Sequence, residues 1–114
     1  MQDFRNLEVW QVAQRLALQV YRVPADFPSA ERYGLTAQMR RAAVSVTSNI
    51  VEGTARGSDR ETARFLRMAL ASAAELHSQL ILVQDLGILD ADRCHALEAH
   101  IVRVKRCSVA SSGT

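Results

Sequence analysis

A ladder of polar residues runs through residues 38–53, the segment QMRRAAVSVTSNIVEG. Its members repeat at steps of three or four residues, which places them on one side of an α-helix. Because small and apolar residues surround them, the mixture favours a buried hydrogen-bond network over a solvated face. The predicted network joins the ladder to two residues of a later segment and consists of Gln38, Arg41, Ser45, Asn49, Glu52, Ser72 and Glu75.

Two carboxylates of this set, Glu52 and Glu75, could serve as a general acid and a general base if they met in one pocket. The sequence supplies no nucleophile, no metal-binding set and no phosphate-binding glycine loop to accompany them. We therefore interpret the ladder as structural, with a contact between subunits as the second interpretation. We predict no enzymatic activity, no catalytic residue and no cofactor.

A stripe of arginines follows the ladder at steps of four, four and three residues. Guanidinium groups bind phosphate in a bidentate manner, and a ring of such faces would bind a nucleic-acid backbone in a salt-dependent way. The competing interpretation is a solvated face or a set of ion pairs between subunits, because Asp59 and Glu61 flank the stripe. The candidate phosphate contacts are Arg56, Arg60, Arg64, Arg67, Arg103, Lys105 and Arg106.

Histidines and cysteines do not form a metal-binding pattern. His95 and His100 are five residues apart and diverge around a helix, and neither Cys94 nor Cys107 belongs to a CxxC motif. We expect two reduced thiols in a cytoplasmic protein, with no bound metal. The chain also lacks a run of about 18 uncharged apolar residues, so we expect no contact with a membrane.

Four segments carry the apolar period of a helix: residues 4–22, a segment ending near 52, residues 58–86, and a segment after Asp90. Local signals mark the boundaries. Prolines end the first helix, and a short turn is expected around residues 29–32. Gly53 is interpreted as the C-terminal cap of the second helix, and Ser58 with Glu61 as the capping box of the third. Gly87 ends the third helix.

Helices joined by short connections predict an all-α fold, an antiparallel up-down-up-down four-helix bundle. We expect the bundle to occupy residues 1–107 and a disordered polar tail to occupy 108–114. The first helix is expected to bury the stripe that contains Leu7 and Trp10, and the third the stripe that contains Met68. The apolar residues left over predict an oligomer interface, consisting of Val9, Val12, Leu18, Leu66 and Leu70.

Three segments resemble a known bacterial family of four-helix-bundle proteins, the 23S rRNA intervening-sequence proteins, also called the S23 ribosomal protein family. They are FRNLEVWQVAQRLALQVY, FPSAERYGLTAQMRRAAVSVTSNIVEG and RFLRMALASAAELHSQL, which cover most of residues 4–90. Departures are modest: Ala71 stands where Gly is frequent, and His77 and Ser78 replace Glu and Thr.

The resemblance implies a cytoplasmic bundle that assembles into a homopentamer and carries no enzymatic activity. A related branch, the accessory proteins of diversity-generating retroelements, binds nucleic acid and a reverse transcriptase. We therefore expect a non-enzymatic homo-oligomeric scaffold that binds RNA or DNA through its arginines. The alternative is a protein-protein adaptor ring that docks a partner enzyme without touching nucleic acid.

Overall fold

The computed structural model describes residues 3–23 and 32–111, and within these ranges every regular element is a helix. The elements are η1 (Phe4–Asn6), α1 (Glu8–Arg22), the π-helical turn η3 (Arg32–Thr36), α3 (Ala37–Ala55), α4 (Asp59–Asp85) and α5 (Ala91–Ser111). The prediction of an all-α chain with four helices is confirmed. The turn expected around residues 29–32 lies mostly in 24–31, outside the described residues.

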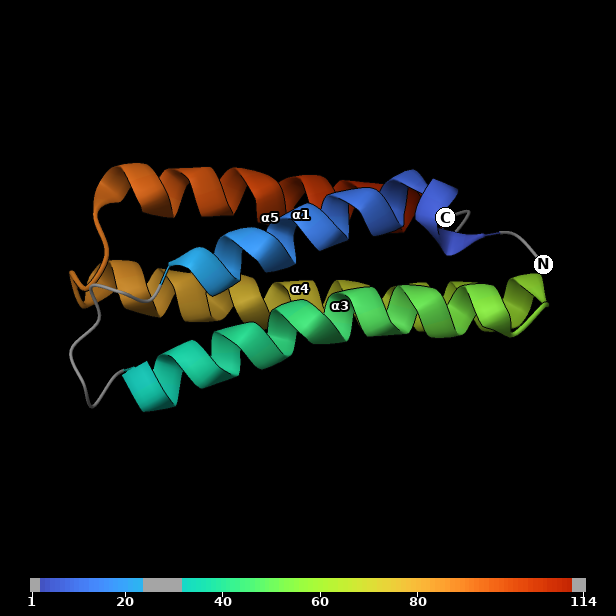
Figure 1. Ribbon diagram of the computed structural model, residues 1–114, viewed down its shortest axis with the longest axis horizontal. Helices are drawn as coiled ribbons and strands as arrows, with labels where there is room; N and C mark the ends of the chain where they lie inside the picture. Colours follow the sequence, from blue (N-terminus) through green and yellow to red (C-terminus); the bar gives the residue numbers. More distant parts are fainter. Residues whose placement is uncertain (1–2, 24–31, 112–114) are drawn as a thin grey trace.

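The chain reverses direction between successive helices, as the colours of Figure 1 show. Helix α1 runs from right to left in that view, α3 returns to the right, α4 runs back, and α5 returns again. Helices α1 and α4 each pack mainly against α3 and α5, so α1 and α4 lie on one diagonal of the bundle. The result is an elongated antiparallel bundle of 44 × 21 × 20 Å.

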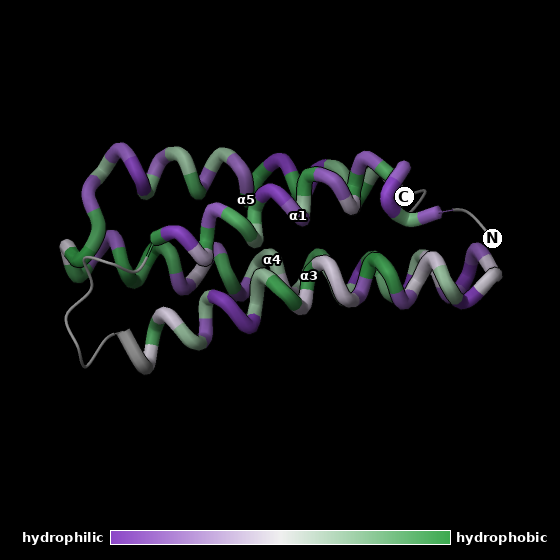
Figure 2. Tube along the Cα trace, in the orientation of Figure 1, coloured by the Kyte–Doolittle hydropathy of each residue, from purple (hydrophilic) through white to green (hydrophobic). Residues whose placement is uncertain are grey.

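The core lies along the bundle axis and takes side chains from all four helices. Polar and apolar residues alternate along each helix with the helical period, which Figure 2 shows as alternating purple and green. Leu16, Ile50, Leu76 and Ile101 are among the fully buried residues of α1, α3, α4 and α5, respectively. Burying one such side chain stabilises the fold by about 1.5–3 kcal/mol.

The local signals for three helix boundaries are confirmed. Ser58 Oγ accepts a hydrogen bond from the Glu61 amide at 3.2 Å, so α4 begins where predicted. Asp90 Oδ1 accepts one from the Arg93 amide at 2.9 Å at the start of α5. Gly87 follows α4 with φ of +69°, a conformation that favours glycine.

The prediction for Gly53 is wrong. Helix α3 continues to Ala55, and the residue in the left-handed region is Gly57, with φ of +79°. Gly53 lies inside the helix at the point where α3 crosses α4, and a Cβ there would lie only 2.9 Å from the Phe65 Cβ. The missing side chain therefore allows two helices to approach rather than one helix to end.

The predicted inward stripe of α1 is confirmed for Ala13, Leu16 and Val20, which are buried, but the buried face is broader than expected. Val9 and Val12 are each 3% exposed and belong to the core, whereas Leu7 and Trp10 are half-buried against it. In α4, Leu66 is buried, while Met68, predicted to face inward, is 42% exposed. The buried stripe of α1 is therefore wider than predicted, and that of α4 includes Leu66 but not Met68.

The C-terminal boundary also differs from the expected one at residue 107. Helix α5 extends to Ser111, and Ser108 is fully buried in the bundle. Residues 108–111 are therefore part of the fold rather than of a disordered tail. The rest of that predicted tail, 112–114, lies outside the described residues.

Candidate nucleic-acid interface

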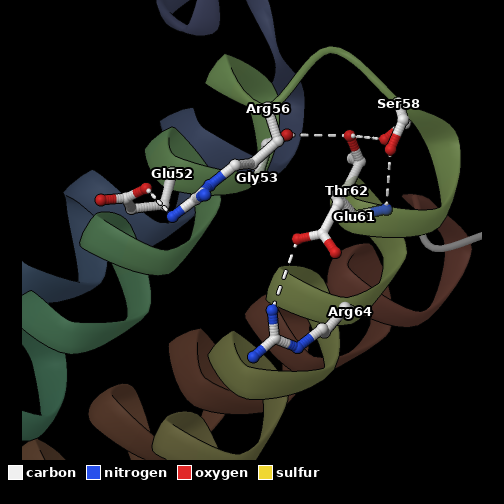
Figure 3. A network of polar contacts seen from close by, with 7 residues as sticks. All are labelled: Glu52, Gly53, Arg56, Ser58, Glu61, Thr62 and Arg64. Carbon is white, nitrogen blue, oxygen red and sulfur yellow. Dashed lines mark hydrogen bonds and ion pairs between the residues drawn. The ribbon is translucent and has the colours of Figure 1, made fainter.

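The short connection between α3 and α4 sets the position of the arginine stripe (Figure 3). The Thr62 hydroxyl lies 2.8 Å from the Gly53 carbonyl oxygen and 2.9 Å from that of Ser58, and can donate to either acceptor. These contacts tie the first turn of α4 to the last turn of α3. As a result Arg56, which follows α3, lies beside the first turns of α4.

Arg56, which precedes the connection, and Arg64, which follows it, both place their guanidinium groups over the aromatic ring of Phe65. Their guanidinium carbons lie 5.0 and 5.4 Å from the centre of the Phe65 ring, which is itself buried. Each guanidinium also donates to a nearby carboxylate, Arg56 to Glu52 at 3.3 Å and Arg64 to Glu61 at 3.4 Å. The pair is thus held in place while both guanidinium groups stay accessible to solvent.

Arg60 and Arg67 complete the stripe on the outward side of α4. Both are exposed, and neither forms an ion pair with any residue in 3–23 or 32–111. With Arg64 they follow steps of four and three residues, so the three side chains share one face of the helix. The sequence predicted this stripe but not the Phe65 ring that supports two of its guanidinium groups. The adjacency of Arg64 and Phe65 in the sequence was a signal for that contact.

The three predicted cations of α5 separate into two groups. Arg103 and Arg106 are exposed and form no ion pair within the described residues. Lys105 instead turns into the junction with α4, where its Nζ lies 2.8 Å from His77 Nδ1. The structure therefore removes Lys105 from the set of free surface cations.

The polar ladder is partly buried at its centre. Ser45 Oγ and Ser72 Oγ lie 2.8 Å apart across α3 and α4, and Asn49 Nδ2 donates to the Ser45 carbonyl and hydroxyl at 2.8 and 3.2 Å. This contact joins the two helices in a partly buried position. The residues at both ends of the ladder are exposed, because their side chains extend beyond the contact between α3 and α4 into solvent.

The prediction of a fully buried network is wrong for the four outer members of the ladder. Gln38, Arg41, Glu52 and Glu75 are all exposed. Glu52 pairs with Arg56, and Glu75 accepts a hydrogen bond from Gln79 at 3.3 Å. The two carboxylates thus have separate partners on their own helices, and the structure does not assemble them as an acid–base pair.

A hollow of about 470 Å³ opens at the same end of the bundle. Its lining includes the carboxyl groups of Glu8 and Asp59 and the apolar side chains of Ile50 and Leu66, but no arginine. A phosphate would meet negative charge there. The basic surface suited to phosphate is therefore the outer face of α4, not this hollow.

The two cysteines are free thiols on α5. Burial raises the pKa of the Cys94 thiol, and burial together with a hydrogen bond to Glu8 raises that of Cys107. Cys107 Sγ lies 3.4 Å from Glu8 Oε1 on α1. In the part of the chain that the structure describes, no three His, Cys, Asp or Glu side chains are placed to hold a metal ion.

Replacing Glu8 by Gln is expected to speed alkylation of Cys107 by iodoacetamide. Loss of the carboxylate removes one cause of the raised pKa, so the thiolate fraction at neutral pH increases. The pKa of Cys107 should therefore fall towards its ordinary value, although burial continues to raise it. Peptide mass spectrometry would measure the rate, with Glu75→Gln as the remote control; equal rates in both variants would contradict the assignment.

The fold and the surface together define an all-α antiparallel four-helix bundle with an arginine-rich end. The chain belongs to the 23S rRNA-intervening sequence protein family, whose model matches residues 5–110. The predicted resemblance is confirmed. Among the described residues, no helix is long and apolar enough to cross a bilayer.

A solved structure shows the same fold. The crystal structure of a protein of unknown function from the S23 ribosomal protein family of Bacteroides thetaiotaomicron is similar to this chain with a TM-score of 0.84. The match covers 93% of this chain and 96% of that one at 16% sequence identity, and shows the fold alone. Neither description names an enzyme. No curated protein sequence matches this chain.

Proposed function

We propose that this protein is a non-enzymatic, homo-oligomeric scaffold that binds the phosphate backbone of RNA or DNA through the outer face of α4. The observation that carries the proposal is the pair of exposed guanidinium groups of Arg60 and Arg67, which form no ion pair with the described residues, beside the positioned pair Arg56 and Arg64. These four residues form the α4 basic surface. We place the protein in the cytoplasm, where both cysteine thiols stay reduced.

The ion pairs of this surface do not prevent phosphate binding. Both are solvent-exposed, and exposed pairs contribute only about 0–1 kcal/mol. A phosphate can therefore replace Glu52 or Glu61 at little cost, while Phe65 continues to hold the guanidinium groups. Arg also presents the planar fork that matches two phosphate oxygens.

Assembly of several copies would increase the positive charge that faces a nucleic acid. Four arginines stand against three carboxylates in residues 52–67, so a single copy has a weak net positive charge at this surface. Repetition in a ring would place several such surfaces on one strand, and linked contacts bind far more tightly than separate ones. The proposed number of subunits is five, as in the family that the sequence resembles.

Exposed apolar side chains support an oligomer. Of the predicted interface, Leu18 is 44% exposed and Leu70 half-buried, so both remain available to another subunit. Val9, Val12 and Leu66 lie in the core of one copy and leave the proposed interface. In their place the chain offers other exposed apolar residues, which are Met68, Ile81 and Leu82 of α4 and Leu86 directly after it.

The test begins with absolute mass by light scattering and continues with binding to a duplex RNA across a salt series. We expect a mass near five copies and an affinity that falls steeply as salt rises. Changing both Arg60 and Arg67 to Gln should make the slope of log affinity against log salt shallower, by about 0.9 for each phosphate that the variant no longer neutralises.

The matched control changes Arg15 and Arg22 to Gln, two exposed arginines that are also seven residues apart, on α1. This variant should keep the parent slope. An oligomer that ignores RNA and DNA at every salt concentration would favour the adaptor ring for a partner enzyme, with the arginines in ion pairs. A monomer would contradict the scaffold itself.

A further inference from the structure

A cluster of three titratable side chains lies outside the α4 basic surface. His77 of α4 stands between two residues of α5: its Nε2 is 3.0 Å from Glu98 Oε2, and its Nδ1 is 2.8 Å from Lys105 Nζ. His77 and Lys105 are half-buried in the junction of the two helices. The order of contacts is amine, imidazole, carboxylate.

The contacts determine where the imidazole proton lies. A lysine ammonium has donors and no acceptor, so Nδ1 must be the unprotonated nitrogen that accepts from Lys105. The remaining proton is then on Nε2, where it is donated to Glu98. The same logic orders catalytic triads: a nucleophile contacts a base, and a third group holds that base in the required tautomer.

Lys105 is the single lysine among the 114 residues, all other side-chain cations at neutral pH being the thirteen arginines. Arginine cannot give up its proton under physiological conditions, whereas a lysine that loses one becomes a nucleophile. The only side-chain amine of the chain is thus held against a base.

A shallow hollow that shares Glu98 with the cluster, but is lined by neither His77 nor Lys105, offers space for a small ligand. It has a volume of about 460 Å³ on the outer face of α5 and includes Glu98, Val102, Arg103 and Arg106 in its lining. Val102 supplies apolar surface, and the two arginines supply donors for phosphate oxygens. An acyl group whose carrier bears a phosphate matches this combination.

We propose that Lys105 is a self-acylation site, with His77 as general base, for activated acyl groups carried as an acyl phosphate or as a phosphate-bearing thioester. His77 Nδ1 takes one proton from the ammonium, and the freed amine attacks the acyl carbon. A C–N bond forms, and the bond from that carbon to the phosphate oxygen or thioester sulfur breaks.

The second amine proton leaves with the carrier, and the proton on His77 passes to solvent. The product is a neutral amide on Lys105 and the released phosphate or thiol. Glu98 is a positioning residue, because it keeps Nδ1 of His77 free to accept. This chemistry goes beyond the proposed scaffold function and does not rest on it.

The experiment incubates the whole protein with acetyl phosphate or acetyl-CoA, without nucleic acid. N-acetyl-lysine amide in the same tube provides an unassisted reference amine, and mass spectrometry follows both. We expect Lys105 to react at least about tenfold faster than the reference with one of the donors. His77→Gln should lower the Lys105 rate by about 100-fold or more, from the lower end of the range that general acid–base catalysis contributes.

The sign of the His77→Gln effect separates the proposal from a purely structural contact. If His77 only shields Lys105, its removal exposes the amine and the rate rises or stays unchanged, which would overturn the proposal. His100→Gln, on the α1 side of α5, is the matched control and should keep the parent rate. A Lys105 no faster than the reference with both donors would also overturn it.

Glu98→Gln provides a second variant in case His77→Gln does not fold. We expect a slower Lys105 reaction together with a change in the tautomer of His77, seen in a two-bond ¹H–¹⁵N spectrum. An unchanged rate would remove Glu98 from the proposal, and a spectrum of the parent with a proton on Nδ1 would overturn it. Changing Arg103 and Arg106 to Gln should slow the reaction with the donor that uses the hollow.

Discussion

Leu76→Ala is expected to lower the free energy of unfolding by about 2–5 kcal/mol. Leu76 lies on α4, the helix that packs against both α3 and α5, and its side chain is 0% exposed. Truncation removes the burial of its apolar atoms and leaves a cavity that neighbouring helices fill only in part. Urea unfolding monitored by circular dichroism would measure the decrease in stability.

The control for this prediction is Leu82→Ala, on the same helix with a side chain 47% exposed. Its effect should stay within about 0.5 kcal/mol if the residue faces water. Both variants should be unfolded at several protein concentrations, since association adds stability that depends on concentration. A large effect of Leu82→Ala at high concentration only would reveal this face as part of the oligomer interface.

Gly53→Ala is expected to destabilise the protein by about 1–3 kcal/mol, the usual cost of overpacking. In an exposed helix the same change would stabilise by about 1 kcal/mol, because alanine has the higher helix propensity. Here the new Cβ would lie 2.9 Å from the Phe65 Cβ and 3.3 Å from the Thr62 carbonyl oxygen. Both neighbours belong to α4 itself, so relief requires the two helices to separate.

Gly34→Ala is the matched control, because a Cβ at Gly34 would meet no atom within 4 Å. It should be neutral or slightly stabilising in the same thermal or urea unfolding measurement. A stabilising Gly53→Ala would show that α3 and α4 are not held at this distance. Because the Phe65 ring contacts the guanidinium groups of Arg56 and Arg64, we also expect Gly53→Ala to disturb the α4 basic surface.

The α4 basic surface could be predicted in part from the sequence. The spacing of Arg60, Arg64 and Arg67 places them on one face of any helix that begins at Ser58. Their environment depended on residues brought in by the turn between α3 and α4. Only the structure places Arg56 over the Phe65 ring and leaves Arg60 and Arg67 unpaired within the described residues.

The sequence by itself determined the features that act within one or two helical turns. Ser58 and Asp90 begin helices because each side chain accepts a hydrogen bond from an amide three residues ahead. Gly87 ends a helix because it adopts a positive φ at little cost. The number of helices and their order follow from such local signals and from periodicity.

Only the tertiary structure decided which faces are buried and which distant residues meet. Val9 and Val12 enter the core of one copy because α1 packs against both α3 and α5, whereas their apolar character alone was also compatible with a contact between subunits. His77 and Lys105 are 28 residues apart and meet because α4 and α5 pack in one register. Register depends on all the contacts of a helix pair together, so no short segment encodes it.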